Sequence, residues 1–242
     1  MHWSTVPSYY PLLHIETFQR RRKMRFLCLH GKGMNAEVLR SQMARICEFF
    51  TPDHEFIFVN GPVPREPMAG IVLKTRQSDE RFFGFTPDDP ALCGQIVDSV
   101  SNFMASAKPF DGIIGFSEGA CVAATIMIAD EQLPQPVFRL KCGIFFCGLS
   151  PIDIQSCSDG KGEPRFLNYD EDGVMLRVPT AHIWSTEGGE FANMGKDLVT
   201  ISDESLREES IHQLGHGIPG SRSDEGLEEA IRAIERTIER AK

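Results

Sequence analysis

The sequence lacks any apolar stretch long enough to cross a membrane as a helix, because its longest apolar runs are strand-sized and interrupted by glycine. It also lacks an excess of basic residues, and its formal net charge is -9. An acidic surface repels a phosphate backbone, so we expect neither nucleic acid nor a membrane as partner. The acidic charge does not exclude a small ligand or a protein partner.

Zinc-site and disulfide-framework spacings are absent from the seven cysteines. Residues 1–23 have no long apolar core and carry their positive charge after their apolar part, so we do not expect them to be a signal peptide. We expect these residues to form a poorly ordered extension, with a weak organelle-targeting segment as the alternative. Free cysteines without an export signal predict a reducing, cytoplasmic setting.

From Met24 onward, short apolar runs alternate with helical patterns, which predicts one α/β domain over residues 24–242. The predicted strands are Arg25–His30, Glu55–Val59, Asp111–Phe116, Lys141–Cys147, Ala181–Ser185 and a weaker element ending near His212. The predicted helices are Ala36–Phe50, Pro90–Ala107, Glu118–Glu131 and Glu225–Ala241. Uniformly apolar strands are buried on both faces, so the sheet should be mainly parallel, between two helix layers. The carboxyl ends of its strands then share one edge, where ligands bind.

The segment Gly115–Gly119 reads G-x-S-x-G, directly after a predicted strand and at the start of a predicted helix. A nucleophilic serine on so tight a turn needs glycine on both sides, because larger side chains would collide with neighbouring backbone. Ser117 is therefore the candidate nucleophile. The competing interpretation is a helix start with Ser117 as an ordinary N-cap.

A serine hydroxyl needs a base, which follows an acid in the chain order of this architecture. His216 lies late, between Gly215 and Gly217, and is the candidate base; His212 competes but falls inside a predicted strand. The acid should follow the fifth strand, in Ser185–Phe191, which offers Glu187 and Glu190 and no aspartate. We favour Glu187, with Glu190 as the alternative.

An oxyanion hole needs two backbone N–H groups. We expect one from Glu118, the residue after the nucleophile, and the other from Lys32 in the glycine-rich turn after the first strand. The alternative is an ordinary βα turn. Phosphate binding there is disfavoured, because no G-K-[ST] with P-loop spacing is present.

Several segments together resemble the fungal serine hydrolase (FSH) domain family: Met24–Gly31, Phe58–Pro64, Phe110–Ala120, Phe145–Pro151, Val178–Trp184 and Gly215–Pro219. The resemblance implies an α/β-hydrolase fold without metal or cofactor, with Ser117 as nucleophile and His216 as base. The family's acid lies in a G-x-x-D segment after the fifth strand, where this sequence has Ser185 and Gly188 instead. That departure leaves Glu187 or Glu190 as substitute, or an impaired site.

Relatives of this type include hydrolases of fungal polyketide clusters, so the resemblance implies a thioesterase or esterase that releases or edits a polyketide-type chain. An acyl carrier protein would then be the partner, docking on a basic patch such as Arg20–Arg25, Arg40 or Arg45. A carboxylesterase for small esters and an impaired binding protein are the alternatives. Phe82 and Phe83 either wall the acyl pocket or pack within a surface loop.

Overall fold

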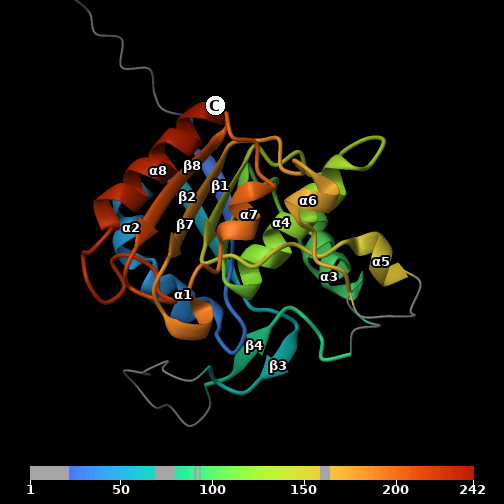
Figure 1. Ribbon diagram of the computed structural model, residues 1–242, viewed down its shortest axis with the longest axis horizontal. Helices are drawn as coiled ribbons and strands as arrows, with labels where there is room; N and C mark the ends of the chain where they lie inside the picture. The colour runs from blue at the N-terminus through green and yellow to red at the C-terminus, as the bar shows by residue number, and fades with distance from the viewer. Residues whose placement is uncertain (1–21, 69–79, 90–91, 93, 159–163) are drawn as a thin grey trace, which may run out of the picture.

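The computed structural model describes residues 22–68, 80–89, 92, 94–158 and 164–242, and within them six strands form one sheet (Figure 1). Their order is β2-β1-β5-β6-β7-β8, and every neighbouring pair is parallel. The bounds are β1 (Met24–Leu29), β2 (His54–Val59), β5 (Gly112–Phe116), β6 (Cys142–Phe146), β7 (Thr180–Ser185) and β8 (Arg207–His212). The prediction of a parallel α/β sheet is confirmed.

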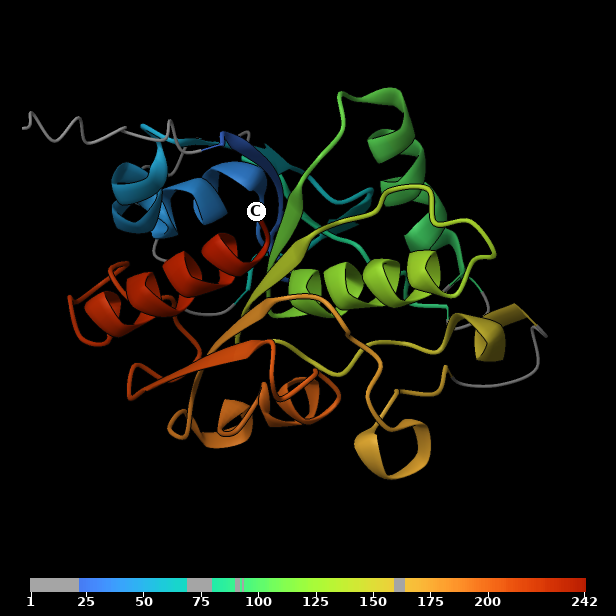
Figure 2. The same ribbon diagram turned by 90° about the horizontal axis from the view of Figure 1, so that it is seen from above.

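Helices cover both faces of this sheet (Figure 2). One face carries α1 (Ala36–Gln42), α2 (Ala44–Phe50) and α8 (Leu227–Arg240). The other carries α3 (Gly94–Ser106), α4 (Glu118–Glu131), α5 (Ile154–Ser158), α6 (Tyr169–Asp172) and α7 (Lys196–Thr200). In β1, Phe26 and Cys28 enter one core while Leu27 and Leu29 enter the other. Burial on both faces explains why the strands read as continuous apolar runs.

The predicted helix Ala36–Phe50 is in fact two helices, which meet at Met43. Asn35 caps the first, its side-chain oxygen accepting a hydrogen bond from the backbone N–H of Val38. Met43 is fully buried and has left the helical conformation (φ -89°, ψ 2°). The interruption thus falls at a buried core residue, in a segment that contains no glycine or proline.

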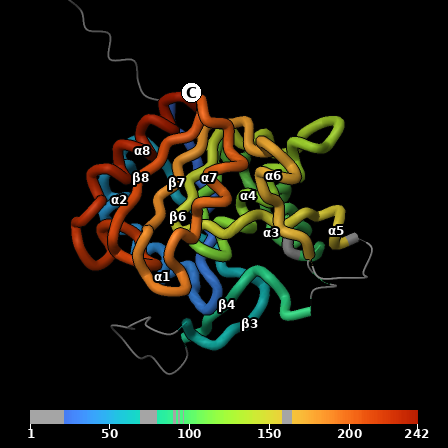
Figure 3. Tube along the Cα trace, viewed as in Figure 1, coloured from blue at the N-terminus to red at the C-terminus, as the bar shows by residue number. Residues whose placement is uncertain are grey.

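A short antiparallel hairpin, absent from the predicted elements, joins β3 (Val63–Arg65) to β4 (Phe82–Gly84) (Figure 3). It stands at the end of the sheet where β1 and β2 finish, and a bridge between Met34 and Phe83 ties it to the turn after β1. The segment after β2 is thus partly ordered structure that flanks the carboxyl edge of the sheet.

Most of the predicted extension, residues 1–21, lies outside the described residues. Within the described part of the chain, no helix is long and apolar enough to span a bilayer. Cys157 is disulfide-bonded, so the expectation that the cysteines are free is wrong for this residue. Cytoplasmic location stays a prediction.

Candidate active site

Ser117 stands on the turn between β5 and α4, with a positive φ of 55° and a ψ of -119°. The flanking residues Gly115 and Gly119 must be glycine, because neither position has room for a Cβ atom. A Cβ at Gly115 would lie 2.4 Å from the Cα of Ala120, and one at Gly119 would lie 2.2 Å from the carbonyl oxygen of Leu29. The strained serine is therefore held at the carboxyl edge of the sheet by close backbone packing on both sides.

His216 lies in the loop after β8, and its Nε2 is 2.9 Å from the Oγ of Ser117. Burial lowers the pKa of His216 from 6.5 to about 4. At neutral pH the imidazole is thus uncharged and able to accept the serine proton. The competing His212 ends β8 and instead accepts a hydrogen bond from the backbone N–H of Leu214.

The structure does not bring either candidate acid onto the imidazole. The Nδ1 of His216 is buried and has no hydrogen-bond partner among the described residues. Glu187 and Glu190 are both exposed, and Glu190 lies in the short 3-10 helix η2 (Gly189–Phe191). The pair that the geometry assembles is Ser117 with His216, without a carboxylate behind it.

Gly188 explains why this loop presents backbone rather than a carboxylate to the base. It has a φ of +115°, and a Cβ added there would lie 3.0 Å from the Cα of Gly215 and 3.3 Å from the N of His216. The loop after β7 and the loop after β8 therefore contact each other through Gly188 and Gly215. An aspartate at position 188 would be strained by its backbone conformation and by this contact.

The two predicted oxyanion donors, Lys32 and Glu118, line the same cleft as Ser117. Their N–H groups donate to no other backbone group in the described residues, as expected for the first residue of a helix in the case of Glu118. His30 fixes the turn that carries Lys32: its Nδ1 donates to the carbonyl of Gly31 (2.7 Å) and its Nε2 accepts from the N–H of Gly61 (3.0 Å).

The side chain of Glu118 has a second task, which sequence reasoning missed. Its carboxylate accepts hydrogen bonds from the N–H groups of Phe85 (3.0 Å) and Thr86 (3.1 Å) and from the hydroxyl of Thr86. These bonds tie the segment after β4 to the start of α4. The sequence shows only that an acidic residue, Glu118, follows the serine, and this does not reveal which segment its carboxylate binds.

Cys147 supports the loop of the base from beneath. Its Sγ is 3.9 Å from the carbonyl oxygen of Gly215 and 3.7 Å from that of Gly217, on either side of His216. Burial raises the pKa of this thiol to about 12, so it stays protonated and donates. Cys147 follows β6 directly and has a positive φ of 45°.

The cleft at Ser117 has a volume of about 700 Å³ and a mostly apolar wall. Its apolar lining residues are Met68, Cys121, Leu149, Ile152, Phe166, Phe191 and Met194. Charged groups stand at Lys32, Arg65, Glu66 and Glu118. Phe82 and Phe83 pair within the hairpin instead and do not line this cleft, so the structure favours the packing interpretation for them.

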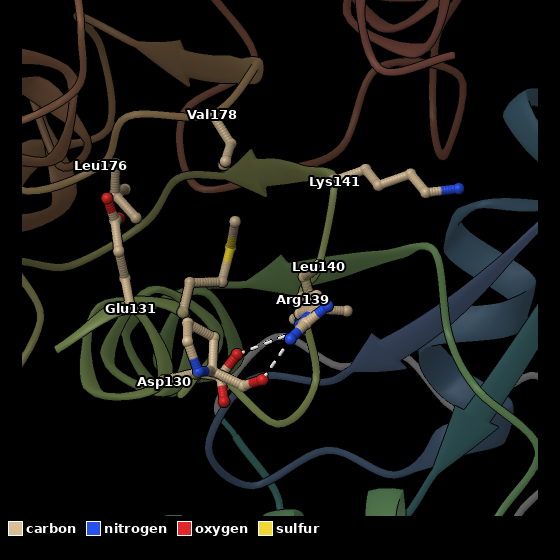
Figure 4. Close-up of a pocket in the computed structure, with 9 residues that line it drawn as sticks. Asp130, Glu131, Arg139, Leu140, Lys141, Leu176 and Val178 are labelled. Atoms are coloured by element: carbon tan, nitrogen blue, oxygen red, sulfur yellow. Dashed lines mark hydrogen bonds between the residues drawn. The ribbon is translucent and has the colours of Figure 1, made fainter. Parts of the chain in front are cut away.

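A second cavity, of about 390 Å³, lies where α4 ends and β6 begins, at the opposite edge of the sheet from Ser117 (Figure 4). Its most buried carboxylate, Asp130, accepts hydrogen bonds from the N–H groups of Val137, Phe138 and Arg139. Asp130 thus holds the loop before β6 and takes no part in the chemistry. Within the described part of the chain, no cluster of three or more His, Cys, Asp or Glu could hold a metal ion.

A parallel sheet with a serine on a strained strand-to-helix turn, bonded to a late histidine, defines an α/β hydrolase of the serine type. The chain belongs to the family described as serine hydrolase (FSH1), whose model matches residues 19–238.

Curated relatives include the esterase FPY3 of Fusarium mangiferae, which is 31% identical over 90% of this chain and 98% of its own length. The esterase FUS5 of Gibberella fujikuroi is 25% identical and covers 90% of each chain. Solved structures with the same fold include esterase PE8 (TM-score 0.54, 18% identity, 89% of this chain and 93% of that one). Another is SOBER1 of Arabidopsis thaliana (TM-score 0.53, 15% identity, 90% and 99%). The chain is a serine hydrolase.

Proposed function

We propose that this enzyme hydrolyses the acyl ester or thioester of an apolar, polyketide-type chain through Ser117 and His216. The observation that carries the proposal is the 2.9 Å hydrogen bond between Ser117 and His216 beside an apolar cleft of about 700 Å³. A cleft of this size accommodates a small organic acyl group.

The chemistry runs in two halves. The Oγ of Ser117 attacks the acyl carbonyl and gives its proton to Nε2 of His216, while the N–H groups of Lys32 and Glu118 bind the developing oxyanion. The intermediate expels the alcohol or thiol, which takes the proton from His216. Water then attacks the acyl-enzyme, gives a proton to His216, and the collapse of the second intermediate returns that proton to Ser117 and releases the acid.

The class of substrate is supported by the lining of the cleft and by the relatives. FPY3 and FUS5 are both named as esterases, which favours an ester over an amide as the substrate of this enzyme. Aromatic and thioether side chains at Phe166, Phe191 and Met194 favour an extended or aromatic acyl chain. A general carboxylesterase for small esters is the alternative with the same chemistry.

Delivery by an acyl carrier protein has weaker support. The described arginines of the suggested docking patch are each paired with an acid: Arg22 with Asp111, Arg25 with Glu55, Arg40 with Glu37, and Arg45 with Asp224. Arg25 also lies at the start of β1, the opposite edge of the sheet from Ser117. Free esters therefore fit this surface better than a carrier-bound chain.

An impaired site is the second candidate function, and the unpartnered Nδ1 of His216 is the observation that favours it. A base without an acid behind it is less well oriented and its charged form less well stabilised. A protein of this kind would bind an acyl compound in the cleft without turning it over.

Labelling with a fluorophosphonate, read by mass spectrometry, separates these functions. We expect an adduct on Ser117 in the native protein and none in Ser117→Ala or His216→Ala, because the hydroxyl is a weak nucleophile without its base. Turnover of matched p-nitrophenyl esters and acyl-CoA thioesters then ranks the two leaving groups. No adduct on folded protein, verified by circular dichroism, would leave the binding function in place of the enzyme.

A further inference from the structure

The imidazole of His216 contacts two aromatic rings. The ring of Phe191 is stacked on it, with centroids 4.6 Å apart and an angle of 21° between planes. The ring of Phe116 covers it at 4.9 Å and 37°. Phe116 immediately precedes the nucleophile, and Phe191 ends η2 in the loop after β7. A ring at the end of β5 and a ring from the loop after β7 thus both contact the base.

The edge of the imidazole has only one partner. Nε2 bonds Ser117, whereas Nδ1 is buried and unpartnered among the described residues. The loop after β7, where the FSH resemblance places a carboxylate, meets the base with the backbone of Gly188 and the ring of Phe191. Burial lowers the pKa of His216 to about 4.

We propose that Phe191 is a positioning residue that takes over part of the work of the missing carboxylate, by holding the ring of His216 and stabilising its charged form. A phenyl face carries partial negative charge and attracts a cation placed over it. The imidazolium that forms when Ser117 loses its proton is such a cation. The proposal rests on the proposed function, because it assigns a role within the same reaction.

Phe191 also lines the acyl cleft, together with Phe166 and Met194. An acyl chain that fills the cleft packs against Phe191 and thereby against the base behind it. Contacts remote from the reacting carbonyl then improve the alignment of His216, which raises kcat as well as lowering KM. We expect substrates with longer acyl chains to have a higher kcat than acetyl esters.

The test compares Phe191→Leu, which removes the π face, with Phe191→Tyr, which keeps it. The matched control is Phe49→Leu, because Phe49 is exposed on α2, does not line the cleft and makes its ring contact with Phe50 instead of His216. We expect Phe191→Leu to lose about 10-fold in kcat and Phe191→Tyr to restore it, since a cation–π contact is worth about a tenfold factor. Phe49→Leu should leave both kcat and KM within about twofold of the native values.

A second readout does not require turnover. The pKa of His216, followed by NMR in the resting protein, should fall by about one unit in Phe191→Leu and return in Phe191→Tyr. A native protein without activity would refute the proposed function, and this titration would still decide the role of Phe191. Phe191→Met serves if the leucine variant fails to fold.

Two results would overturn the inference. One is an unchanged kcat and an unchanged His216 titration in Phe191→Leu. The other is a loss of more than about 100-fold in Glu187→Gln or Glu190→Gln, which would show that a carboxylate reaches Nδ1 during turnover.

Discussion

At the scale of single residues, the base is held through its neighbours as much as through its own side chain. The thiol of Cys147 donates to the carbonyls on either side of His216, and the positive φ of Cys147 aims it there. We therefore expect Cys147→Ala to lower kcat/KM about 5-fold, on the scale of one weak hydrogen bond. Cys147→Ser should lose less, because serine still donates.

The measurement is steady-state kinetics with a p-nitrophenyl ester, paired with thermal unfolding. Cys28→Ala is the matched control, because this thiol is also fully buried but belongs to β1. An equal loss of activity in both variants would contradict a specific role for Cys147 in supporting the base.

The placement of Ser117, His216, Lys32 and Glu118 around one cleft could be predicted, because each belongs to a short motif whose spacing reflects backbone sterics. The carboxylate anchor at Glu118 and the ring at Phe191 could not. Glu118 bonds a segment 32 and 33 residues away, and Phe191 meets a histidine from another loop. Contacts of this kind depend on how loops are placed in space, which periodicity does not encode.

At the scale of elements, the strand-to-helix turn is the least tolerant part of the fold. A methyl group at Gly119 would stand 2.2 Å from the carbonyl oxygen of Leu29 in β1. We expect Gly119→Ala to destabilise the protein by about 3 kcal/mol, because a backbone atom cannot move aside as a side chain can.

Gly94→Ala provides the control. Gly94 begins α3, and nothing lies within 4 Å of a Cβ placed there. This variant should match the native free energy of unfolding or exceed it by up to about 1 kcal/mol. Denaturant unfolding measures both. Equal stabilities for the two variants would mean that the turn adjusts more freely than its contacts indicate.

The longer helical segments and all six sheet strands followed from apolar periodicity, since burial of a strand on both faces leaves a continuous apolar run. The break at Met43, the short helices α5, α6 and α7, and the β3–β4 hairpin did not. Met43 is buried and leaves the helical conformation although methionine favours a helix, so its residue type gives no sign of the break. The hairpin strands are only three residues each, too short to show alternation.

At the scale of the whole molecule, buried histidines tie stability to pH. Burial lowers the pKa of four of them: His30, His182, His212 and His216. His182 is the extreme case, at about 3, because it is fully buried in β7 and Arg207 adds repulsion. Histidine in the unfolded chain has a pKa of about 6.5. Below this pH the unfolded chain therefore binds more protons than the folded chain, in which the buried histidines stay neutral.

Stability should therefore be complete above about pH 6.5 and fall as the pH drops toward the folded pKa values. His182 alone contributes a slope of about 1.4 kcal/mol per pH unit between about pH 6 and 4. Guanidinium unfolding over this pH range measures the slope. In His182→Gln, whose side chain can still bond Thr180, unfolding should take up about one proton fewer, so the free energy of unfolding should depend less steeply on pH. Identical slopes would show that His182 takes up its proton in the folded state.

The position of the acid relative to His216 could not be predicted from the sequence. The sequence confined it to Ser185–Phe191, and two glutamates were available there. Whether either reaches the base depends on the backbone path, and Gly188 against Gly215 sets that path with both glutamates exposed. Such a contact joins loops after two different strands and leaves no local signature.

The anchor at Glu118 also bears on how substrate range can change. Its two longer bonds go to the backbone N–H groups of Phe85 and Thr86, which every residue except proline possesses. Mutation can therefore change the side chain of Thr86, which lines the cleft, without detaching this segment from the turn that carries the nucleophile. Substitutions at this position would alter the acyl groups that the cleft accepts while the catalytic geometry stays in place.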